Sequence, residues 1–491
     1  MNTILIILIV VYVIPIAFIA LYSFAQLHLL SVYLKNKKNV ISAKPEIKEF
    51  PMVTVQLPIY NELYVIERLI DRVCEFDYPL DRLEIQVIDD STDETLDIVA
   101  KRIATHQANG IDIKQVFRKD RVGYKAGALE QANITAKGEF LAIFDADFIP
   151  RRDFLIETIP YFVDSKIGVV QTRWDHLNLN YSILTKVQGF ALDAHFSIEQ
   201  TGRNVLDHFI NFNGTAGVWR KTCIDDAGGW QPDTLTEDLD LSYRAQLKGW
   251  KFKYLAHIES PAELPVTMTA IKSQQFRWTK GAAEVSKKLI LKVLKSQVPL
   301  STKFHAFFHL LNSTVYIPIF LVAFLSVPVL YIKNIYPETN AVFKYAGFFL
   351  VSLIILGAIY YVSLAESEKG SKWSKIGKFL YLFPSFLSFS MGLSLHNTIA
   401  VIEGYAGKKS AFIRTPKFNI NDNKDAWKGN KYSLKKMSPL LIIEVALAIY
   451  FLFGLIKGVM FNDYGLFHFH FLLSFGYISV VFYTIKHAKN A

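Results

Sequence analysis

The sequence predicts an α/β domain with a mostly parallel sheet, inserted between transmembrane α-helices. The chain has 491 residues, of which 51% are hydrophobic, and the longest apolar runs lie at its two ends. Between these ends, short apolar runs alternate with amphipathic segments, which is the pattern of a parallel sheet covered by helices on both faces. Acidic residues follow two of the predicted strands, at the edge where such sheets bind ligands.

The first apolar segment, Ile4–Leu30, has no charged residue and exceeds the roughly 20 residues that a helix needs to cross a bilayer. A cleaved secretory signal is the alternative. The segment is too long for one, however, and it lacks an early lysine and a small-residue cleavage pattern. We therefore predict an N-terminal transmembrane helix within residues 1–35.

Residues 36–270 are predicted to form one soluble domain. The predicted strands are Met52–Leu57, Glu84–Ile88, Asp112–Phe117, Phe140–Phe144 and Gly168–Gln171, and the predicted helices are Glu62–Glu75, Thr92–His106, Tyr124–Thr135 and Arg152–Phe162. Strands that alternate with helices in this way form parallel sheets with right-handed crossovers.

The C-terminal part contains four more segments long enough to span a bilayer. They are Ala306–Ile332, Tyr345–Ala365, Pro439–Phe461 and Leu466–Ile485. We expect interfacial helices at 271–303, two transmembrane helices at 304–365, an interfacial helix and a loop at 366–438, and two transmembrane helices at 439–491. The segment Leu380–Ile402 carries several polar residues, so we expect it to lie in the membrane interface or to face a cavity, although a re-entrant segment is also compatible.

Basic residues next to the predicted spans indicate the orientation of the chain. They are Lys35, Lys37 and Lys38 after the first span, and Lys408, Lys409, Arg414, Lys417, Lys424, Lys428, Lys431, Lys435 and Lys436 in a later loop. The positive-inside tendency places both segments, and the soluble domain, in the cytoplasm. These basic clusters also explain the net charge of +10, because they attract anionic lipid, and no nucleic-acid-binding motif accompanies the charge.

The chain has two cysteines, Cys74 and Cys223. They are too few for a disulfide framework, which is consistent with a reducing compartment.

Two acidic pairs close predicted strands. Asp89 and Asp90 end the run QVIDD, and Asp145 and Asp147 follow LAIF. Carboxylates one residue apart would repel each other unless a divalent cation such as Mg²⁺ or Mn²⁺ lay between them. Acidic residues at strand ends also cap helices, which is the better interpretation of Asp93.

A carboxylate further along the chain is a candidate general base. If a cation stabilises a departing diphosphate, another group must remove a proton from the incoming hydroxyl. Asp238 in LTEDLDL is the best candidate, with Glu237 and Asp240 as rivals. A carboxylate at a helix N-terminus is the structural alternative, and both roles are compatible.

Cationic and aromatic residues suit the same chemistry. Lys125 follows Gly123 at a predicted helix start, where an ammonium and backbone N–H groups can approach a diphosphate, although a solvated lysine fits equally well. In the QQFRW run from Gln274, Arg277 offers a planar fork for phosphate oxygens and Trp278 an apolar face for a sugar ring. Arginine and tryptophan are also common membrane-interface anchors.

Several motifs occur in a characteristic order. They are VQLPIYNE (Val55–Glu62), VIDDSTDET (Val87–Thr95), VGYKAGAL (Val122–Leu129), AIFDADF (Ala142–Phe148), FNGTAGVWR (Phe212–Arg220), TEDLDLSYRAQLKGWKF (Thr236–Phe252) and QQFRW. With them the chain resembles a processive, inverting family 2 glycosyltransferase of the cellulose synthase superfamily. It is most similar to the plant cellulose-synthase-like A and C enzymes, which make mannan, glucomannan or xyloglucan backbones. The resemblance implies a nucleotide-sugar-binding domain of the GT-A type.

The resemblance also implies roles for individual residues. Asp89 and Asp90 would hold the nucleotide, Asp145 and Asp147 the metal and diphosphate, Lys125 a phosphate, and Gln274, Arg277 and Trp278 would border the diphosphate and the acceptor, with Asp238 as the base. Phe212, Asn213, Gly214 and Thr215 match the position where relatives cradle the growing glycan, with Trp219 as a further candidate.

Two departures from the family pattern affect these expectations. The FxVTxK gating loop of relatives corresponds to Phe412, Thr415 and Lys417, but Arg414 replaces the valine. The plant enzymes generally have VED where this chain has TED. At this one position the chain is more similar to bacterial synthases. We also expect no appended regulatory domain, because the sequence ends soon after the last predicted span.

The leading functional hypothesis is a polysaccharide synthase in the membrane. It would use GDP-mannose or UDP-glucose to elongate a β-1,4-type glycan in the cytosol and thread the product through its own helices. Tyr316, Tyr360 and Trp373 could line that path or simply pack in the membrane. A glycolipid synthase that transfers one sugar to a lipid is the first alternative. A catalytically silent export or assembly partner is the second, and the intact acidic motifs argue against it.

Overall fold

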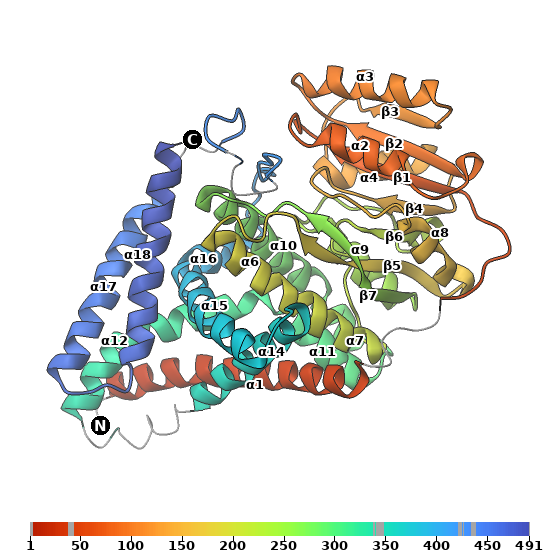
Figure 1. The fold of residues 1–491 in the computed structure, drawn as a ribbon. Helices are drawn as coiled ribbons and strands as arrows, with labels where there is room; N and C mark the ends of the chain where they lie inside the picture. The colour runs from red at the N-terminus through yellow and green to blue at the C-terminus, as the bar shows by residue number, and fades with distance from the viewer. Residues whose placement is uncertain are drawn as a thin grey trace.

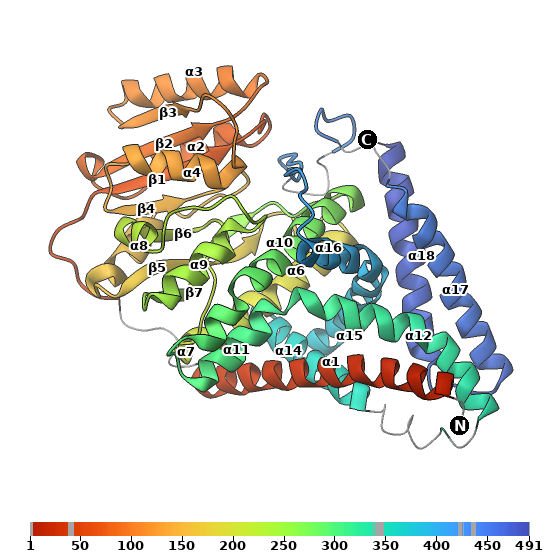
Figure 2. The same ribbon diagram turned by 180° about the vertical axis from the view of Figure 1, so that it is seen from behind.

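A seven-stranded sheet and a group of long apolar helices make up the two parts of the molecule (Figure 1). The computed structural model describes residues 3–37, 44–336, 339, 348–420, 425, 427–433 and 438–490. Figures 1 and 2 show α10, Met268–Lys295, between the sheet and the helical part. This position makes α10 the connection between the two parts.

The sheet has the strand order β3-β2-β1-β4-β6-β5-β7. The strands are β1 Val53–Ile59, β2 Leu83–Asp89, β3 Ile113–Phe117, β4 Phe140–Ile143, β5 Ile167–His176, β6 Gly217–Arg220 and β7 Lys251–Ala262. Neighbouring strands are parallel except at β6, which runs antiparallel to β4 and β5. The mostly parallel sheet and the five predicted strands are confirmed. The short β6 and the irregular β7 were not predicted.

Helices cover both faces of this sheet. They are α2 Ile66–Cys74, α3 Thr95–Ala108, α4 Tyr124–Thr135, α5 Phe154–Thr158, α8 Lys221–Asp226 and α9 Glu237–Leu247, with 3-10 turns at Leu80–Arg82 and Ile159–Val163. The helices α6 Ile183–Ala194 and α7 Thr201–Val205, with a π-helical turn at His195–Gln200 between them, pack mainly against the long apolar helices. The helix predicted over Arg152–Phe162 is divided, because Pro160 has no N–H group to continue the α-helical bonding.

The core explains why the central strands read as continuous apolar runs. Every residue of β1, β2 and β4 is buried. One apolar cluster on one face of the sheet includes Phe76, Phe144 and Phe154. Another on the opposite face includes Leu129 and Trp219. Strands buried on both faces lose the alternating pattern of a half-exposed sheet. Their carboxyl ends then meet at one edge, where the polar residues lie.

Five helices within the described part of the chain are long and apolar enough to cross a membrane. They are Ile7–Asn36 in α1 (Thr3–Asn36), Ser313–Ile335 in the turn Ser313–Val315 and α12 (Tyr316–Ile335), Leu350–Ser367 in α14 (Phe348–Ser367), α17 Leu440–Met460 and α18 Phe467–Lys489. The protein is an integral membrane protein. Which side of the membrane the sheet faces stays a prediction. Residues 345–347 of one predicted span, and Lys38, Lys424, Lys435 and Lys436, lie outside the described residues.

The predicted helix Leu380–Ile402 is in fact two helices. They are α15, Lys372–Gly392, and α16, Ser394–Ala406, which meet at an angle of 51°. Next to the break, α15 approaches α18 so closely that a Cβ atom on Gly392 would lie 2.5 Å from the carbonyl oxygen of Gly476. Small residues allow such close helix packing in membranes. Whether the pair crosses the membrane or lies in its interface stays a prediction.

Membrane helices hold the first half of α10. The backbone N–H of Met268 donates to Nδ1 of His487 in α18 at 2.9 Å. The Lys272 ammonium lies 2.6 Å from the carboxylate of Glu444, which is fully buried in α17. On the other side α10 contacts α11, Leu300–Leu310, and α16. The QQFRW segment of α10 is therefore fixed from both sides.

Candidate active site

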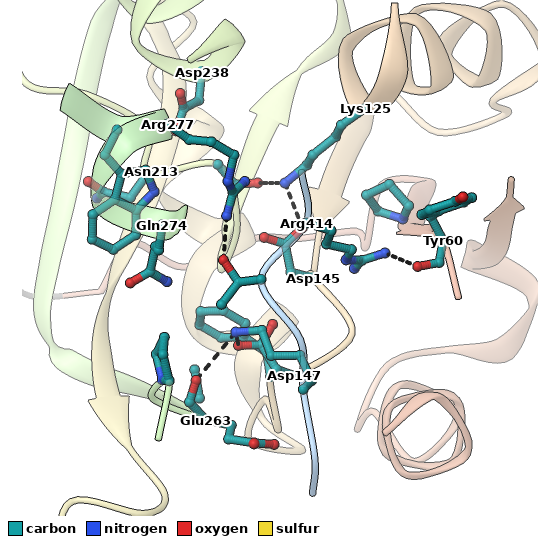
Figure 3. A pocket seen from close by; sticks show the side chains of 18 of the residues that line it. Tyr60, Lys125, Asp145, Asp147, Asn213, Asp238, Glu263, Gln274, Arg277 and Arg414 are labelled. Carbon is teal, nitrogen blue, oxygen red and sulfur yellow. Dashed lines mark hydrogen bonds and ion pairs between the residues drawn. The ribbon is translucent and has the colours of Figure 1, made fainter. Parts of the chain in front are cut away.

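One cavity at the carboxyl ends of the central strands collects residues that are far apart in the sequence (Figure 3). Most of the residues singled out from the sequence line it: Asp90, Lys125, Asp145, Asp147, Asn213, Gly214, Glu237, Asp238, Gln274, Arg277, Trp278, Phe412, Thr415 and Lys417. They come from the segments after β2 and β4, the segment before β6, the starts of α4 and α9, the middle of α10 and the loop after α16. Their convergence is the main geometric finding.

Each carboxylate of the Asp145–Asp147 pair faces an ammonium group. Nζ of Lys125 lies 2.6 Å from Asp145 and donates to the carbonyl oxygen of Gly214 at 2.8 Å. Nζ of Lys417 lies 2.6 Å from Asp147. Burial lowers the pKa of Lys125, but Asp145, Glu237 and Asp238 raise it overall, so this lysine is firmly charged.

The pair fits a hard divalent cation that takes its other ligands from a substrate. Among the described residues, no three His, Cys, Asp or Glu side chains form a closed metal site. Mg²⁺ is commonly held by only one or two carboxylates together with substrate phosphates and water. Asp145 and Asp147 line one cavity, and each forms an ion pair with a lysine ammonium group. Their carboxylate oxygens are the kind of ligand that such a cation requires.

The candidate base is buried at the N-terminus of α9. Burial raises the pKa of Asp238 to about 7, and the charge of Glu237 adds to this effect. Burial also raises the pKa of Glu237, against the influence of Lys125. A Cβ atom on Gly214, whose φ is +79°, would lie 3.0 Å from Oδ2 of Asp238, so glycine lets the backbone come close to the carboxylate.

Asp240, one rival for the role of base, lies outside the cavity. Its side chain is fully buried, with one oxygen 2.8 Å from Arg244 and the other 2.9 Å from Lys288. Because Asp240 does not line the cavity, it is not placed to take a proton from a substrate bound there. The geometry therefore leaves Asp238 and Glu237 as candidates.

Arg277 from the QQFRW segment is held by the loop that follows α16. Its Nη2 donates to Oγ1 of Thr415 at 2.6 Å, and its guanidinium lies 4.7 Å from the centre of the Phe412 ring. Burial lowers the pKa of Arg277 to about 10, with a contribution from Arg414, so the group stays charged at neutral pH.

Arg414, which replaces the family's valine, has partners of its own. Nη1 donates to the carbonyl oxygen of Tyr60 at 2.8 Å, and the guanidinium forms an ion pair with Glu62. Burial raises the pKa of Glu62 to about 8 even though Arg414 opposes this shift. Glu263 accepts from the backbone N–H groups of Phe418 and Asn419, each at 2.9 Å. These contacts hold the loop against the sheet domain.

Some residues expected at the site lie behind the cavity wall. Asp89 is buried and accepts from the N–H of Ser91 at 2.9 Å and from Gln115 at 2.8 Å, so it stabilises the turn after β2. Phe212 is fully buried, with its ring centre 5.5 Å from that of Trp219. Oγ1 of the buried Thr215 accepts from the N–H of Asp145 at 2.9 Å. Neither these residues nor the buried Trp219 line the cavity, and the substrate contacts expected of them stay predictions.

Asp90 lines the cavity and has cationic partners. Nε of Arg118 donates to it at 2.9 Å, and Nε of Arg121 lies 4.0 Å away. The guanidinium of Arg121 lies 3.3 Å from the centre of the Tyr60 ring. Arg121 and Tyr60 were missed in the sequence, although Tyr60 lies within the VQLPIYNE motif and Arg121 directly precedes the VGYKAGAL motif.

The residues Trp174, Asp175 and His176 also line the cavity and were missed. They close β5, and the ring of Trp174 lies 6.4 Å from that of Trp278, centre to centre. Polar residues at this strand end were the available signal, because the ends of neighbouring parallel strands bind ligands at one edge.

A second cavity begins where Leu192, Gln274 and Trp278 line both spaces. Its remaining lining comes from α6, α10, the start of α12, α15 and α16: Leu184, Val187, Gln188, Ala191, Met268, Ile271, Gln275, Tyr316, Phe386, Phe389, Ser390, Leu393 and Asn397. Tyr316 therefore lies on a route from the candidate site into the helices. Tyr360 packs against Phe190, and Trp373 is 80% exposed, so neither lines this cavity.

A mostly parallel sheet with acidic strand ends, joined to membrane helices by a helix that carries a QxxRW motif, is the architecture of a membrane-bound glycosyltransferase of the GT-A type. The sequence model described as "Glycosyltransferase like family 2" matches residues 51–281, and the chain belongs to this family. Glucomannan 4-beta-mannosyltransferase 9 of Arabidopsis thaliana is 34% identical over 455 residues, which cover 88% of this chain and 81% of that protein. The resemblance drawn from the motifs is confirmed.

Other relatives match over a shorter region. "Probable glucomannan 4-beta-mannosyltransferase 11" of Oryza sativa subsp. japonica is 45% identical over 265 residues, which cover 53% of this chain and 46% of the relative. The match thus spans about half the length of that relative. Among solved structures, the mannosyltransferase PcManGT from Pyrobaculum calidifontis, in complex with GDP-Man and Mn²⁺, superimposes with a TM-score of 0.53 at 19% identity. The superposition covers 80% of this chain and 100% of that one and shows a common fold.

Proposed function

We propose that this protein transfers mannose from GDP-mannose to the end of a growing β-1,4-linked glycan. The observation that carries the proposal is the convergence of Asp145, Asp147, Asp238 and Arg277 in one cavity. The names of the plant relatives and the GDP-Man bound by the structural neighbour favour mannose over glucose. UDP-glucose remains the donor against which the proposal is tested.

The charged residues of the cavity bind the nucleotide-sugar donor. Asp145 and Asp147 would hold Mg²⁺ or Mn²⁺, which would balance the charge of the departing diphosphate. Lys125 and Arg277 present an ammonium and a planar guanidinium to the remaining phosphate oxygens. Asp90 lines the cavity beside Arg118 and Arg121 and belongs to the nucleotide end.

Proton removal falls to Asp238. A carboxyl group with a pKa of about 7 is a far better proton acceptor than an exposed aspartate, and half of it is ionised at neutral pH. It accepts the proton of the acceptor hydroxyl while that oxygen attacks the anomeric carbon. A single displacement of this kind inverts the configuration at that carbon. Burial keeps the pKa of Asp238 high, and the negative charge of Glu237 adds to this effect.

The second cavity supports secretion of the product. It begins at Gln274 and Trp278 and leads between α6, α15 and α16. A glycan extended by one sugar at a time would leave along this route, with the sheet domain in the cytoplasm as the basic segments predict.

A lipid acceptor is the second candidate. The observation that favours it is the apolar lining of the second cavity, which includes Leu184, Val187, Ile271, Phe386 and Phe389. A glycolipid synthase would place its acceptor tail there and would stop after one transfer.

The test is product analysis with the purified protein in proteoliposomes. Supplied with Mn²⁺ and labelled GDP-mannose, it should form label that resists lipid extraction and is released by an endo-β-1,4-mannanase. Label that moves into the organic phase as one sugar per lipid would support the glycolipid alternative. Incorporation from UDP-glucose alone would refute mannosyl transfer, and no incorporation from either donor would favour a silent partner.

A further inference from the structure

Asp240 is the acidic residue of the LTEDLDL motif that the proposed mechanism does not use. It lies in α9 two residues after Asp238 and is fully buried outside the cavity. A buried carboxylate is costly unless cations or hydrogen-bond donors compensate its charge. Arg244 of the same helix supplies one cation, at 2.8 Å, and Lys288 of α10 supplies another, at 2.9 Å. Asp240 therefore joins the helix that carries the candidate base to the helix that carries QQFRW.

The ammonium group of Lys288 binds both ends of the base segment, residues 231–240. In addition to its ion pair with α9, it lies 2.8 Å from the carboxylate of Asp233 and donates to Oε1 of Gln231 at 2.8 Å. Residues 235–238 lie between these partners in the sequence, and all four line the cavity. One lysine of α10 therefore holds the chain both before and after the base.

Two further residues of α10 contact the middle of the base segment. Oε2 of Glu284 accepts from the backbone N–H of Leu235 at 2.8 Å. A Cβ atom on Gly281 would lie 2.6 Å from Cγ2 and 2.7 Å from Oγ1 of Thr236, so glycine lets the helix and the segment come this close. The base segment therefore contacts α10 at three positions along that helix.

These three positions continue the helix face that lines the cavity. Gln274, Arg277, Gly281, Glu284 and Lys288 are spaced by three or four residues, which places them along one face of an α-helix. The first two line the cavity, and the other three contact the base segment. Figures 1 and 2 show α9 beside α10. A single helix therefore presents residues toward the diphosphate position and holds the segment that carries the base.

We propose that Glu284 and Lys288 are positioning residues that hold Asp238 at a fixed distance from Arg277, and that Asp240 is the anchor for Lys288. The inference rests on the proposed function and names the residues that set the geometry of its base. The base, the acceptor hydroxyl and the departing diphosphate must be aligned, and a shift of about 1 Å in one of them can lower the rate about 10²-fold. Neither Glu284 nor Lys288 lines the cavity, so both act through Asp238.

The experiment measures kcat and the KM for GDP-mannose with the intact protein in proteoliposomes and β-1,4-mannotetraose as acceptor. Lys288→Met removes the ammonium group, and Glu284→Leu removes the acceptor of the Leu235 N–H. Each should lower kcat about tenfold to 100-fold. The KM for GDP-mannose should stay near the wild-type value, since the charged residues of the cavity are intact. Lys288→Arg keeps a cation and Glu284→Gln keeps an acceptor, so both should restore most of kcat.

Asp240→Asn tests the anchor. It should lower kcat about as much as Lys288→Met does, and the double variant should be no slower than either single variant, because both changes remove the same ion pair. The rate should still rise with pH through about 7, the pKa of the buried Asp238. Loss of this pH dependence in Asp240→Asn would make Asp240 the titrating base and would contradict its role as an anchor.

The Asp238→Asn variant separates positioning of the base from general support of the fold. If Lys288 acts through Asp238, adding Lys288→Met to Asp238→Asn should not lower the residual rate further. An additional tenfold fall, about the size of the effect in the wild type, would overturn the proposal. Lys287→Met is the matched control. Lys287 is exposed and donates to the carbonyl oxygen of Tyr405 in α16 at 2.8 Å, so its loss should leave kcat and KM unchanged.

The outcomes separate the two proposals. If the wild-type protein transfers no sugar to the oligosaccharide, the proposed function is wrong and the positioning of its base fails with it. If the wild type is active but folded Lys288→Met and Glu284→Leu proteins keep the wild-type kcat, only the positioning role is wrong. A rise in the KM for GDP-mannose without a fall in kcat would also overturn it. Thermal unfolding of each variant verifies folding, and if Lys288→Met does not fold, the comparison of Glu284→Leu with Glu284→Gln decides.

Discussion

The two ends of the active-site cavity differ in chemical character. One end is charged. Lys125 forms an ion pair with Asp145 and Lys417 forms one with Asp147, and Arg277 lines the same cavity. Where the second cavity begins, the residues that line both spaces, Leu192, Gln274 and Trp278, are uncharged. Fixed charges suit a diphosphate, whose charge must be balanced as it leaves. Neutral donors and ring faces suit a glycan that must be held and then released at every cycle.

Asp238 lies between these ends, and its substitution should have the largest effect. Asp238→Asn removes the proton acceptor and keeps the shape, so kcat should fall by about 10²–10⁴-fold, the usual contribution of a general base. The donor KM should stay near the wild-type value, because the charged end is intact. The measurement is sugar incorporation together with a thermal unfolding curve. Full activity in this variant would contradict the assignment of the base.

The charged end is tested by its metal requirement. Asp147→Asn should lower kcat by about 10²–10³-fold, a typical loss for one electrostatic contact to the reacting groups. It should also raise the Mn²⁺ concentration needed for half-maximal activity. Asp112→Asn is the control, because Asp112 is partly exposed and pairs with Lys137 away from the cavity. An unchanged Mn²⁺ dependence in Asp147→Asn would remove this residue from the metal site.

The pH profile tests whether burial raises the pKa of Asp238 in the cavity. Its pKa is raised to about 7, and the base works only when ionised, so activity must rise with pH through that value. Below it, kcat/KM should fall by about tenfold per pH unit. Glu237→Gln removes a charge that holds this pKa up and should shift the midpoint to lower pH. A profile that is flat between pH 5 and 8 would contradict the account.

The smallest effect is expected at the loop. Arg414→Val restores the family residue but leaves the buried Glu62 without its ion-pair partner. Because the loop is then held to the sheet domain by one ion pair fewer, we expect about a fivefold rise in the donor KM, with kcat nearly unchanged. Arg72→Val, which removes an exposed arginine that pairs with Glu75, is the control. A change in the acceptor KM alone would place the loop at the other end of the cavity.

Local patterns in the sequence were enough to predict the central strands and the acidic strand ends. Strands buried on both faces read as apolar runs, and Asp145 and Asp147 stand directly after such a run. The strand β6 has four residues and β7 alternates irregularly, so neither produced a clear pattern. Next to the break at Leu393, Gly392 packs against Gly476 of α18, a contact between distant segments that no local pattern reveals.

The same limit explains the site residues that were missed or misplaced. Motifs indicated which segments reach the cavity, but within FNGTAG only Asn213 and Gly214 line it, while Phe212 and Thr215 pack behind it. The backbone turns within this segment, where Gly214 has a φ of +79° and Ala216 a φ of +54°, and the sequence alone does not tell which residues such a turn brings to the cavity. Arg414 was interpreted only as a departure from the family pattern of the gating loop. Its ion-pair partner Glu62 belongs to the first motif of the chain, so nothing in the sequence indicates that the two residues meet.

The most direct test of the whole account is an experimental structure with GDP, Mn²⁺ and a β-1,4-mannooligosaccharide bound. The account predicts a cation held by Asp145 and Asp147 and a terminal sugar hydroxyl about 3 Å from the Asp238 carboxylate. The sugar chain should run past Trp174 and Trp278 into the second cavity. A glycan bound outside this cavity, or a cation that contacts neither aspartate, would contradict it.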